Sequence, residues 1–265
     1  MTLVGAAVTP VRGQGWGDAI GAFESLTGRA LPVRRCYDGA PPASVGGGQL
    51  RYDVGARKSV YSFKPTMRTP IATLEGLAAD IVERGHDCDV IIFHEPVDDM
   101  SGQAFVRLYR RSAPPFRRAG VPVGVCFTNW SCNLPYSDPR SALRHYWPGE
   151  GLVDFVAIDE YPIGEITSNG DATPMDVRTR RVCQFADARG VPLGLAEYGV
   201  DVSWDVRKSE RWLRSVTDWG RARAAHGKPL RWVCYFHSDV GGHYRLSHAE
   251  HLDAYRDTAR ALAVR

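Results

Sequence analysis

The sequence predicts an α/β protein folded as a single (β/α)8 TIM barrel. Eight strand-like runs alternate with segments of helical periodicity, and polar side chains follow nearly all of the runs. Strands joined by helices form parallel sheets, and eight is the number that closes into a barrel. The 265 residues also match the length of about 250 that such barrels commonly have. Since no linker or shift in composition divides the chain, residues 1–265 are expected to form one domain.

The eight runs are apolar and rich in β-branched residues, as in parallel strands that are covered on both faces. In chain order they are Thr2–Val8, Leu31–Gly39, Ser59–Pro65, Cys88–Pro96, Pro122–Asn129, Val153–Tyr161, Pro192–Gly199 and Arg231–Asp239.

Segments of helical period lie between the runs, and three of them end at a glycine that stops the helix. The clearest is IATLEGLAADIVERG (71–85), which places four apolar residues on one stripe. These residues are Leu74, Leu77, Ile81 and Val82, and the segment ends at Gly85. The segments 101–120 and 176–190 end at Gly120 and Gly190, each followed by Val-Pro and a new strand, which fits short connections.

An open, doubly wound sheet is the alternative fold. A glycine-rich phosphate loop after the first strand would favour it. RGQGWGDAIG supplies Gly13, Gly15 and Gly17 there, but their spacing is not G-x-G-x-x-G. Trp16 would also crowd a pyrophosphate. The sequence therefore favours the barrel and predicts no cofactor.

Charge and hydropathy argue against two classes of partner. The formal net charge is only +3 and the arginines are scattered, so no nucleic-acid-binding stripe is predicted. No segment approaches the roughly 20 apolar residues of a membrane span, and MTLVGAAVTP lacks the basic region of a signal peptide. The chain as written is expected to be cytoplasmic, or secreted or particle-associated if a leader is missing or the gene is phage-borne. A monomer is favoured.

No metal site is predicted. The cysteines lack the paired spacing of a zinc knuckle. Cys88, Cys132 and Cys183 could form a disulfide in an oxidising compartment, which the sequence leaves open. HAEHLD (248–253) places two histidines among acidic residues, and we interpret it as the solvated start of a helix.

Barrel enzymes carry their chemistry at the carboxyl ends of the strands. Polar residues gather at that end in seven of the eight runs. They are Arg35, Tyr37 and Asp38; Lys64; His94 and Glu95; Asn129 and Trp130; Asp159, Glu160 and Tyr161; Glu197 and Tyr198; and His237 and Asp239. The pattern predicts a ring of functional groups around the mouth of the barrel.

Two carboxylates in this ring follow nearly uncharged strands, Glu95 after the fourth and Glu197 after the seventh. Cleavage of a glycosidic bond uses two carboxyl groups across a pocket, one protonated as general acid and one ionised. A glutamate that pairs with an arginine is the structural alternative for either residue alone. It is less favoured for both together.

Three motifs resemble the retaining glycoside hydrolases of clan A. They are FHEP at Phe93–Pro96, VDFVAIDEYP at Val153–Pro162 and LAEYGV at Leu195–Val200. His-Glu in place of the commoner Asn-Glu is similar to glycoside hydrolase family 26, the β-mannanases. The resemblance covers essentially the whole chain in element order. It implies a (β/α)8 barrel in which Glu95 is the acid/base and Glu197 the nucleophile.

The resemblance also implies roles for their neighbours. His94 would bond the substrate or orient a carboxylate, and Tyr161 would hydrogen-bond the nucleophile. Arg35 would be the arginine near the nucleophile, with Arg34 as the alternative because strand alternation turns only one of the two inward. The chain departs from the family in lacking an arginine before His-Glu and an aromatic-rich stretch after it. Those departures concern mannan specificity more than glycoside hydrolysis.

Tryptophans supply candidate platforms for sugar rings, since aromatic faces stack on pyranoses. Trp130 after the fifth strand and Trp204 after the seventh are the best placed, with Asn129 and Tyr37 as polar substrate-binding candidates. Three further tryptophans are not favoured as platforms: Trp232, Trp212 and Trp219 are expected in the core. Trp147 stays a weaker candidate platform.

Two other functions are alternatives. One is a non-catalytic carbohydrate-binding barrel, or a phage- or wall-associated glycan-binding protein, against which retention of both glutamates argues. The other is a metal-dependent deacetylase or amidohydrolase, which would need His-x-His on the first strand, where TLVGAAV has no histidine. Mannan, mixed-linkage glucan, xylan and actinobacterial wall polysaccharides all remain candidate substrates, with endo or exo action.

If Glu95 and Glu197 are the catalytic pair of a retaining enzyme, we expect a particular distance between them and particular pKa values. The carboxyl groups of Glu95 and Glu197 should lie about 5–5.5 Å apart. The pKa of Glu95 should be raised, whereas arginine and tyrosine donors should hold down the pKa of Glu197.

Overall fold

The computed structural model describes residues 1–163 and 172–263, and it has the predicted fold. Eight strands follow one another in sequence order around a closed barrel. Every strand pair whose register is described runs parallel. Each predicted run contains one strand. The strands are β1 (Leu3–Val8), β2 (Val33–Asp38), β3 (Lys58–Phe63), β4 (Cys88–Ile92), β5 (Val123–Thr128), β6 (Phe155–Glu160), β7 (Leu193–Tyr198) and β8 (Trp232–His237).

Helices connect the strands and follow the last one. They are α1 (Trp16–Thr27), the 3-10 turns η1 (Val45–Gly47) and η2 (Gln49–Tyr52), α2 (Ile71–Glu83), α3 (Gly102–Ser112), α4 (Pro114–Arg118), α5 (Asn129–Asn133), α6 (Ala142–His145), α7 (Met175–Arg178), α8 (Arg180–Ala188), α9 (Val206–Ala225) and α10 (Ala249–Leu262). None of these helices combines the length and the apolarity that crossing a bilayer requires.

The chain divides into two compact units. The first comprises Met1–Arg35, Glu160–Arg180 and Gly194–Arg265, and the second comprises Cys36–Asp159 and Arg181–Leu193. Glu197 therefore belongs to the first unit and Glu95 to the second.

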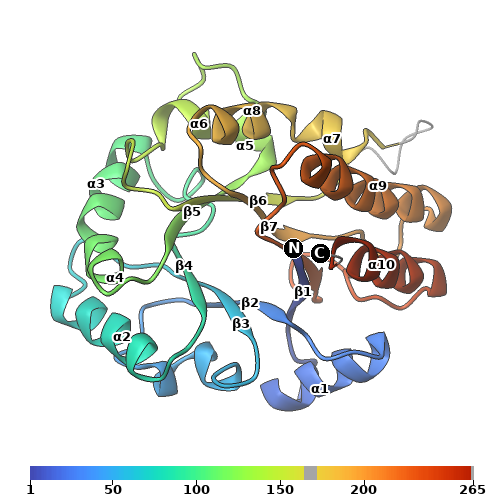
Figure 1. Ribbon diagram of the computed structural model, residues 1–265, viewed down its shortest axis with the longest axis horizontal. Coiled ribbons are helices and arrows are strands. Elements are labelled where there is room, and N and C mark those ends of the chain that lie inside the picture. The colour runs from blue at the N-terminus through green and yellow to red at the C-terminus, as the bar shows by residue number, and fades with distance from the viewer. Residues whose placement is uncertain (164–171, 264–265) are drawn as a thin grey trace. The chain divides into compact units, whose positions relative to one another are not determined.

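In the first unit, β1 pairs with both β2 and β8. Val8 pairs with His237, so β1 and β8 end level, and Ala7 pairs with Arg35 of β2. Helices α9 and α10 pack side by side (Figure 1). Trp212 and Trp219 on α9 are buried, as predicted for a core stripe.

In the second unit, β3 to β6 form successive parallel pairs. The β3–β4 register is unbroken up to Phe63 beside Ile92, and β5 and β6 end with Thr128 beside Asp159. Helices α2 and α4 lie side by side outside these strands (Figure 1). The strand ends of this unit therefore carry His94, Glu95 and Asn129 at successive positions of the sheet.

The helices differ from the prediction in two ways. On α2, Ala78 joins Leu74, Leu77 and Ile81 in the core, whereas Val82 is 50% exposed. The predicted stripe was wrong at Val82, because the buried residues are spaced 3, 1 and 3 positions apart and Val82 lies at the edge of the face that they form.

Two predicted helices are each split in two. Segment 101–120 breaks at Ala113, because the prolines at the start of α4 lack the amide protons that would continue α3. Segment 176–190 breaks at Thr179, between α7 and α8. Gly120 and Gly190 end the two segments with φ of 80° and 64°, as a glycine stop requires.

All six cysteines are buried free thiols. Cys36 donates to Asp53 at 3.7 Å and Cys126 donates to Asp159 at 3.2 Å. Cys88, Cys132 and Cys183, for which pairing was left open, form no disulfide in the structure.

The close approach of β1 to β2 predicts a large effect on stability. A Cβ added at Gly5 would lie 1.7 Å from the main-chain oxygen of Val33. Gly5→Ala should therefore push the strands apart and lower the free energy of unfolding by about 3 kcal/mol or more. The matched control is Gly21→Ala on the exposed face of α1, where the new Cβ has no atom within 4 Å. It should raise the free energy of unfolding by about 0.5–1 kcal/mol. Urea unfolding measures both, and equal stability of the two variants would contradict the prediction.

Candidate active site

Glu197 lies near the end of β7, where a cation from β2 and a hydroxyl donor from just after β6 hold its carboxylate. Nε of Arg35, on β2, lies 3.5 Å from Oε1, and the side chain of Arg35 is fully buried. The hydroxyl of Tyr161, just after β6, donates to Oε2 at 3.0 Å. Arg34 is buried as well, but the described ion pair with Glu197 is made by Arg35. The carboxylate is therefore buried, with a fixed cation and a hydroxyl donor beside it.

Burial decides the ionisation of Glu197, which is 9% exposed. Desolvation raises the pKa of Glu197, while the charge of Arg35 and the hydrogen bond from Tyr161 lower it. Desolvation is the largest of these effects, so the pKa is raised above the usual value. The expectation that the donors would hold this pKa down is therefore wrong. When ionised, the carboxylate is poorly solvated and interacts strongly with positive charge that develops beside it.

Aromatic rings surround the phenol that contacts Glu197. Tyr161 packs against Tyr244 and Phe236, with ring centroids 5.1 and 5.9 Å apart. Trp204, a predicted sugar platform, is half-buried and meets Tyr244 edge-on at 6.3 Å. These rings come from the ends of β6 and β8 and from the segments that follow β7 and β8. They give the first unit an apolar wall beside a carboxylate.

The loop that carries Trp204 is fixed by Asp201. The carboxylate of Asp201 accepts from the amide and hydroxyl of Ser203 at 2.8 and 2.6 Å, and from the amide of His243 at 2.8 Å. These hydrogen bonds hold the pKa of Asp201 below its usual value, although burial opposes them. One ionised side chain thus ties the segment after β7 to the segment after β8.

In the second unit, β4 ends in a strained backbone. Phe93 and Glu95 have φ of 57° and 50°, and they are the non-glycine residues with positive φ among those described. This conformation is costly for residues with a Cβ, and above all for a bulky one. Two main-chain hydrogen bonds of 3.0 Å hold it in place, from Phe93 to Phe63 and from Glu95 to Cys126. Strain at a half-buried carboxyl group at a strand end indicates a functional site.

A contact with β3 orients the ring of His94. Its Nδ1 lies 2.9 Å from the hydroxyl of Ser62 on β3, and its ring packs against Tyr37 with centroids 5.6 Å apart. His94 and Tyr37 therefore pack together at the end of β4, where His94 is next in sequence to Glu95.

The two candidates after β5 have different environments. Asn129 is buried, whereas Trp130 is 51% exposed. The guanidinium of Arg140 lies 5.1 Å from the centre of the Trp130 ring. An exposed indole is able to stack on the face of a sugar ring.

Several strand-end polar residues have structural partners instead. Lys64 pairs with Asp99 at 2.5 Å, and Asp239 pairs with Arg245 at 2.5 Å. Asp38 accepts from the hydroxyl of Tyr61 at 2.7 Å. These side chains link the strand ends to neighbouring loops and strands, which was not predicted from the sequence.

Two further members of the predicted ring are buried. His237 accepts from the amide of Leu246 at 3.1 Å, and burial lowers its pKa to about 4. Tyr198 does not lie at the mouth, because it packs against Trp212 of α9 and Tyr235 of β8. Adjacent residues of a strand face opposite sides, so the neighbour of Glu197 points toward the helices.

The remaining sequence candidates lie elsewhere. Trp232 is fully buried, as predicted. Trp147 packs edge-on against Phe185 at 5.1 Å. His251 is also fully buried, so the interpretation of HAEHLD as solvated was wrong at that residue, and burial lowers its pKa. The described residues contain no cluster of three or more potential metal ligands.

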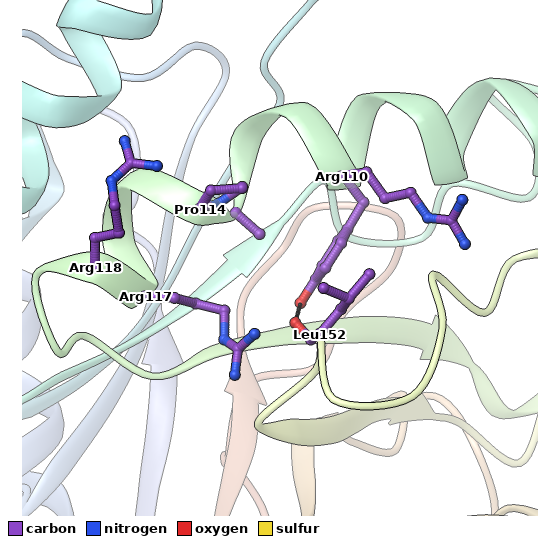
Figure 2. Close-up of a pocket in the computed structure, with 7 residues that line it drawn as sticks. Arg110, Pro114, Arg117, Arg118 and Leu152 are labelled. Atoms are coloured by element: carbon purple, nitrogen blue, oxygen red, sulfur yellow. Dashed lines mark hydrogen bonds between the residues drawn. The ribbon is translucent and has the colours of Figure 1, made fainter.

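A cavity of about 250 Å³ is lined by residues other than the strand-end candidates (Figure 2). Its walls are the end of α3, residues along the whole of α4, and Leu152. Its cations already have partners, since Arg117 pairs with Asp154 at 3.2 Å and Arg118 with Glu75 at 2.9 Å. Nε of Arg110 donates to the oxygen of Pro148 at 2.8 Å. The cavity therefore lacks the carboxylate chemistry of the strand ends.

Sequence reasoning missed several residues of these groups, among them Ser62, Tyr244 and Asp201. Ser62 could have been found, because alternation along β3 places it on the same face as Lys64. Tyr244 and Asp201 lie in the segments after β8 and β7, where no periodicity indicates which way a side chain points.

No family model matches the chain, and no curated protein matches its sequence. Solved structures resemble it over nearly its full length. One is a GH128 (subgroup I) endo-β-1,3-glucanase from Amycolatopsis mediterranei in complex with laminaritriose, with 15% identity and a TM-score of 0.60, covering 97% of this chain and 100% of that one. Another is an endo-β-1,4-glucanase from Xanthomonas axonopodis pv. citri, with 11% identity and a TM-score of 0.64, covering 100% of both chains.

A third is a Cellulomonas fimi endo-β-1,4-mannanase double mutant, with 15% identity and a TM-score of 0.58, covering 97% of this chain and 70% of that one. At these identities the likeness shows the fold, which is the predicted barrel. The neighbours are described as glycoside hydrolases of different substrates, so they do not single out family 26 among the clan A enzymes.

Proposed function

We propose that the chain is a clan A retaining glycoside hydrolase that cleaves a β-linked polysaccharide. Glu197 is the nucleophile and Glu95 the acid/base in this proposal. The observation that carries it is the environment of Glu197, a buried carboxylate at a strand end that is held by Arg35 and Tyr161. The strained backbone at Glu95, the sequence motifs and the names of the structural neighbours support it.

The first step forms a covalent bond between Glu197 and the sugar. The carboxylate of Glu197 attacks the anomeric carbon as Glu95 gives a proton to the leaving oxygen. Tyr161 and Arg35 hold the attacking group in one rotamer, and its poor solvation favours the positive charge of the oxocarbenium-like transition state. In the second step Glu95 takes a proton from water, which displaces Glu197 and restores the anomeric configuration.

The proposed substrates are β-glucans and β-mannans, cut within the chain. The neighbours with β-1,3-glucanase, β-1,4-glucanase and β-1,4-mannanase activity support this range. Trp130 and Trp204 are the proposed stacking residues, with His94, Asn129 and Tyr37 as polar contacts. The proposed activities are therefore β-1,4-mannanase, β-1,3-glucanase and β-1,4-glucanase action.

Digestion of a polysaccharide panel tests the proposal. Laminarin, carboxymethyl cellulose, mixed-linkage glucan, xylan and mannan are each incubated with the wild-type protein, and reducing ends are measured. We expect release from at least one of them, with a rapid fall in viscosity that indicates endo action. The Glu95→Gln/Glu197→Gln double variant serves as the control for contaminating enzymes. Binding to a polysaccharide without any cleavage would instead support the non-catalytic barrel.

A further inference from the structure

A buried salt bridge lies at the end of β6, beside the residue that contacts Glu197. Glu160 is 2% exposed, and its Oε1 accepts from Nε of Arg178 at 2.5 Å. Nη2 of the same guanidinium donates to the main-chain oxygen of Tyr161 at 3.2 Å. The planar fork of an arginine can bind two acceptors in a fixed relative position, which a lysine cannot do. Arg178 thus fixes two successive residues at the strand end.

Arg178 is itself attached to a rigid support. It is the last residue of α7, which packs on α9. The amide of Met175, the fully buried first residue of α7, donates to the hydroxyl of Ser215 at 3.1 Å. That hydroxyl donates in turn to the oxygen of Trp212 at 2.6 Å. The guanidinium is therefore anchored through α9 as well as through Glu160.

We infer that Arg178 is a positioning residue for Glu197, because it fixes the main chain of Tyr161, whose hydroxyl holds the carboxylate. The inference rests on the proposed function of Glu197. The ring of Tyr161 is confined at its sides by Tyr244 and Phe236, which leaves the position of its peptide to set where the hydroxyl lies. Arg178 supplies that restraint without touching Glu197 in the described contacts.

The test compares Arg178→Gln, Tyr161→Phe and the double variant by the pH dependence of kcat/KM on an activated aryl β-glycoside. The same proteins, labelled with ¹³C in the glutamate carboxyl groups, give the titration of Glu197 by NMR, assigned from its loss in Glu197→Gln. Tyr161→Phe removes a hydrogen bond that lowers the pKa of Glu197, so the acidic limb should move to higher pH. Arg178→Gln should move it in the same direction by at least half as much.

The double variant separates positioning from general destabilisation. If Arg178 acts through Tyr161, the double variant should shift no further than Tyr161→Phe alone. Arg180→Gln is the matched control, since Arg180 is exposed and lies two residues along, and it should leave the titration unchanged. A wild-type titration in Arg178→Gln, or shifts that add in the double variant, would overturn the inference.

A second readout is needed if Arg178→Gln does not fold or if the wild-type protein is inactive. Arg178→Gln leaves the buried Glu160 without its cation and could fail to fold. Arg178→Lys keeps that charge but cannot reach both acceptors, and it should show a smaller shift in the same direction; no shift would count against the inference. If the wild-type protein cleaves no β-glycoside, the proposed function fails, and the NMR titration still decides whether Arg178 positions Glu197.

Discussion

Replacing Glu197 by alanine should abolish hydrolysis of polysaccharides and of activated aryl glycosides alike. Without the nucleophile no glycosyl–enzyme intermediate forms, whatever the quality of the leaving group. We expect a loss of about a thousandfold or more in kcat/KM on both substrates, which corresponds to about 4 kcal/mol of barrier. Azide, if it restores any turnover, should give the α-glycosyl azide, because it attacks from the face that the carboxylate left.

Glu197→Gln controls for the fold, because it keeps the volume of the side chain and an acceptor for Tyr161. It should be equally inactive, with an unfolding transition closer to that of the wild type than Glu197→Ala, which leaves Arg35 buried without its partner. A Glu197→Gln protein that kept wild-type turnover of aryl glycosides would exclude Glu197 as the nucleophile.

Replacing Glu95 by alanine should affect the two substrates unequally. Departure of a sugar needs a proton from the enzyme, whereas departure of an activated aryl group does not. The loss on polysaccharide should be about a hundredfold to ten-thousandfold. On an activated aryl glycoside the first step should survive, and azide should accelerate turnover by entering the space of the missing carboxyl group. The product should be the β-glycosyl azide, identified by NMR.

The matched control for this variant is Asp98→Asn, which removes an exposed carboxylate three residues along. It should leave both activities unchanged. Equal losses on both substrates in Glu95→Ala, with no rescue by azide, would indicate a structural role for Glu95. An α-glycosyl azide from Glu95→Ala would reverse the two assignments. The configurations predicted for the azide products of Glu95→Ala and Glu197→Ala assume a β-linked substrate.

The barrel could be predicted from the sequence because its strands carry an unusually uniform signal. Every run that was short, apolar and followed by polar residues contains a strand, and most boundaries agree within two residues. β4 is the exception, since it ends at Ile92, four residues before the predicted end. The positive φ of Phe93 breaks the extended conformation there, and an apolar side chain gives no sign of such a break.

The residues around Glu197 were only partly predictable. Strand alternation and the family resemblance indicated Arg35, which lies within β2, and the resemblance indicated Tyr161, which directly follows β6. The sign of the pKa change was missed, since the sequence does not show how much solvent reaches a carboxylate. Arg178 was missed because it lies on a short helix, 18 residues after its partner Glu160. Tyr198 was misplaced because the strand-end pattern alone did not separate the two faces of β7.

The two carboxyl groups belong to separate compact units, so the spacing of about 5–5.5 Å stays a prediction. The mechanism can be tested without that distance. A retaining enzyme forms a covalent bond between its nucleophile and the sugar, and an inverting enzyme does not.

Trapping this intermediate tests the central claim most directly. The protein is incubated with a 2-deoxy-2-fluoro-β-glycoside that carries an activated leaving group, chosen for the sugar released in the polysaccharide panel. The fluorine slows both steps and the leaving group speeds the first, so the intermediate accumulates. Intact mass and peptide mapping then locate the sugar. The account predicts one sugar per chain, attached to Glu197 and absent from Glu197→Gln. A sugar attached to Glu95, or an active enzyme that forms no adduct, would contradict it.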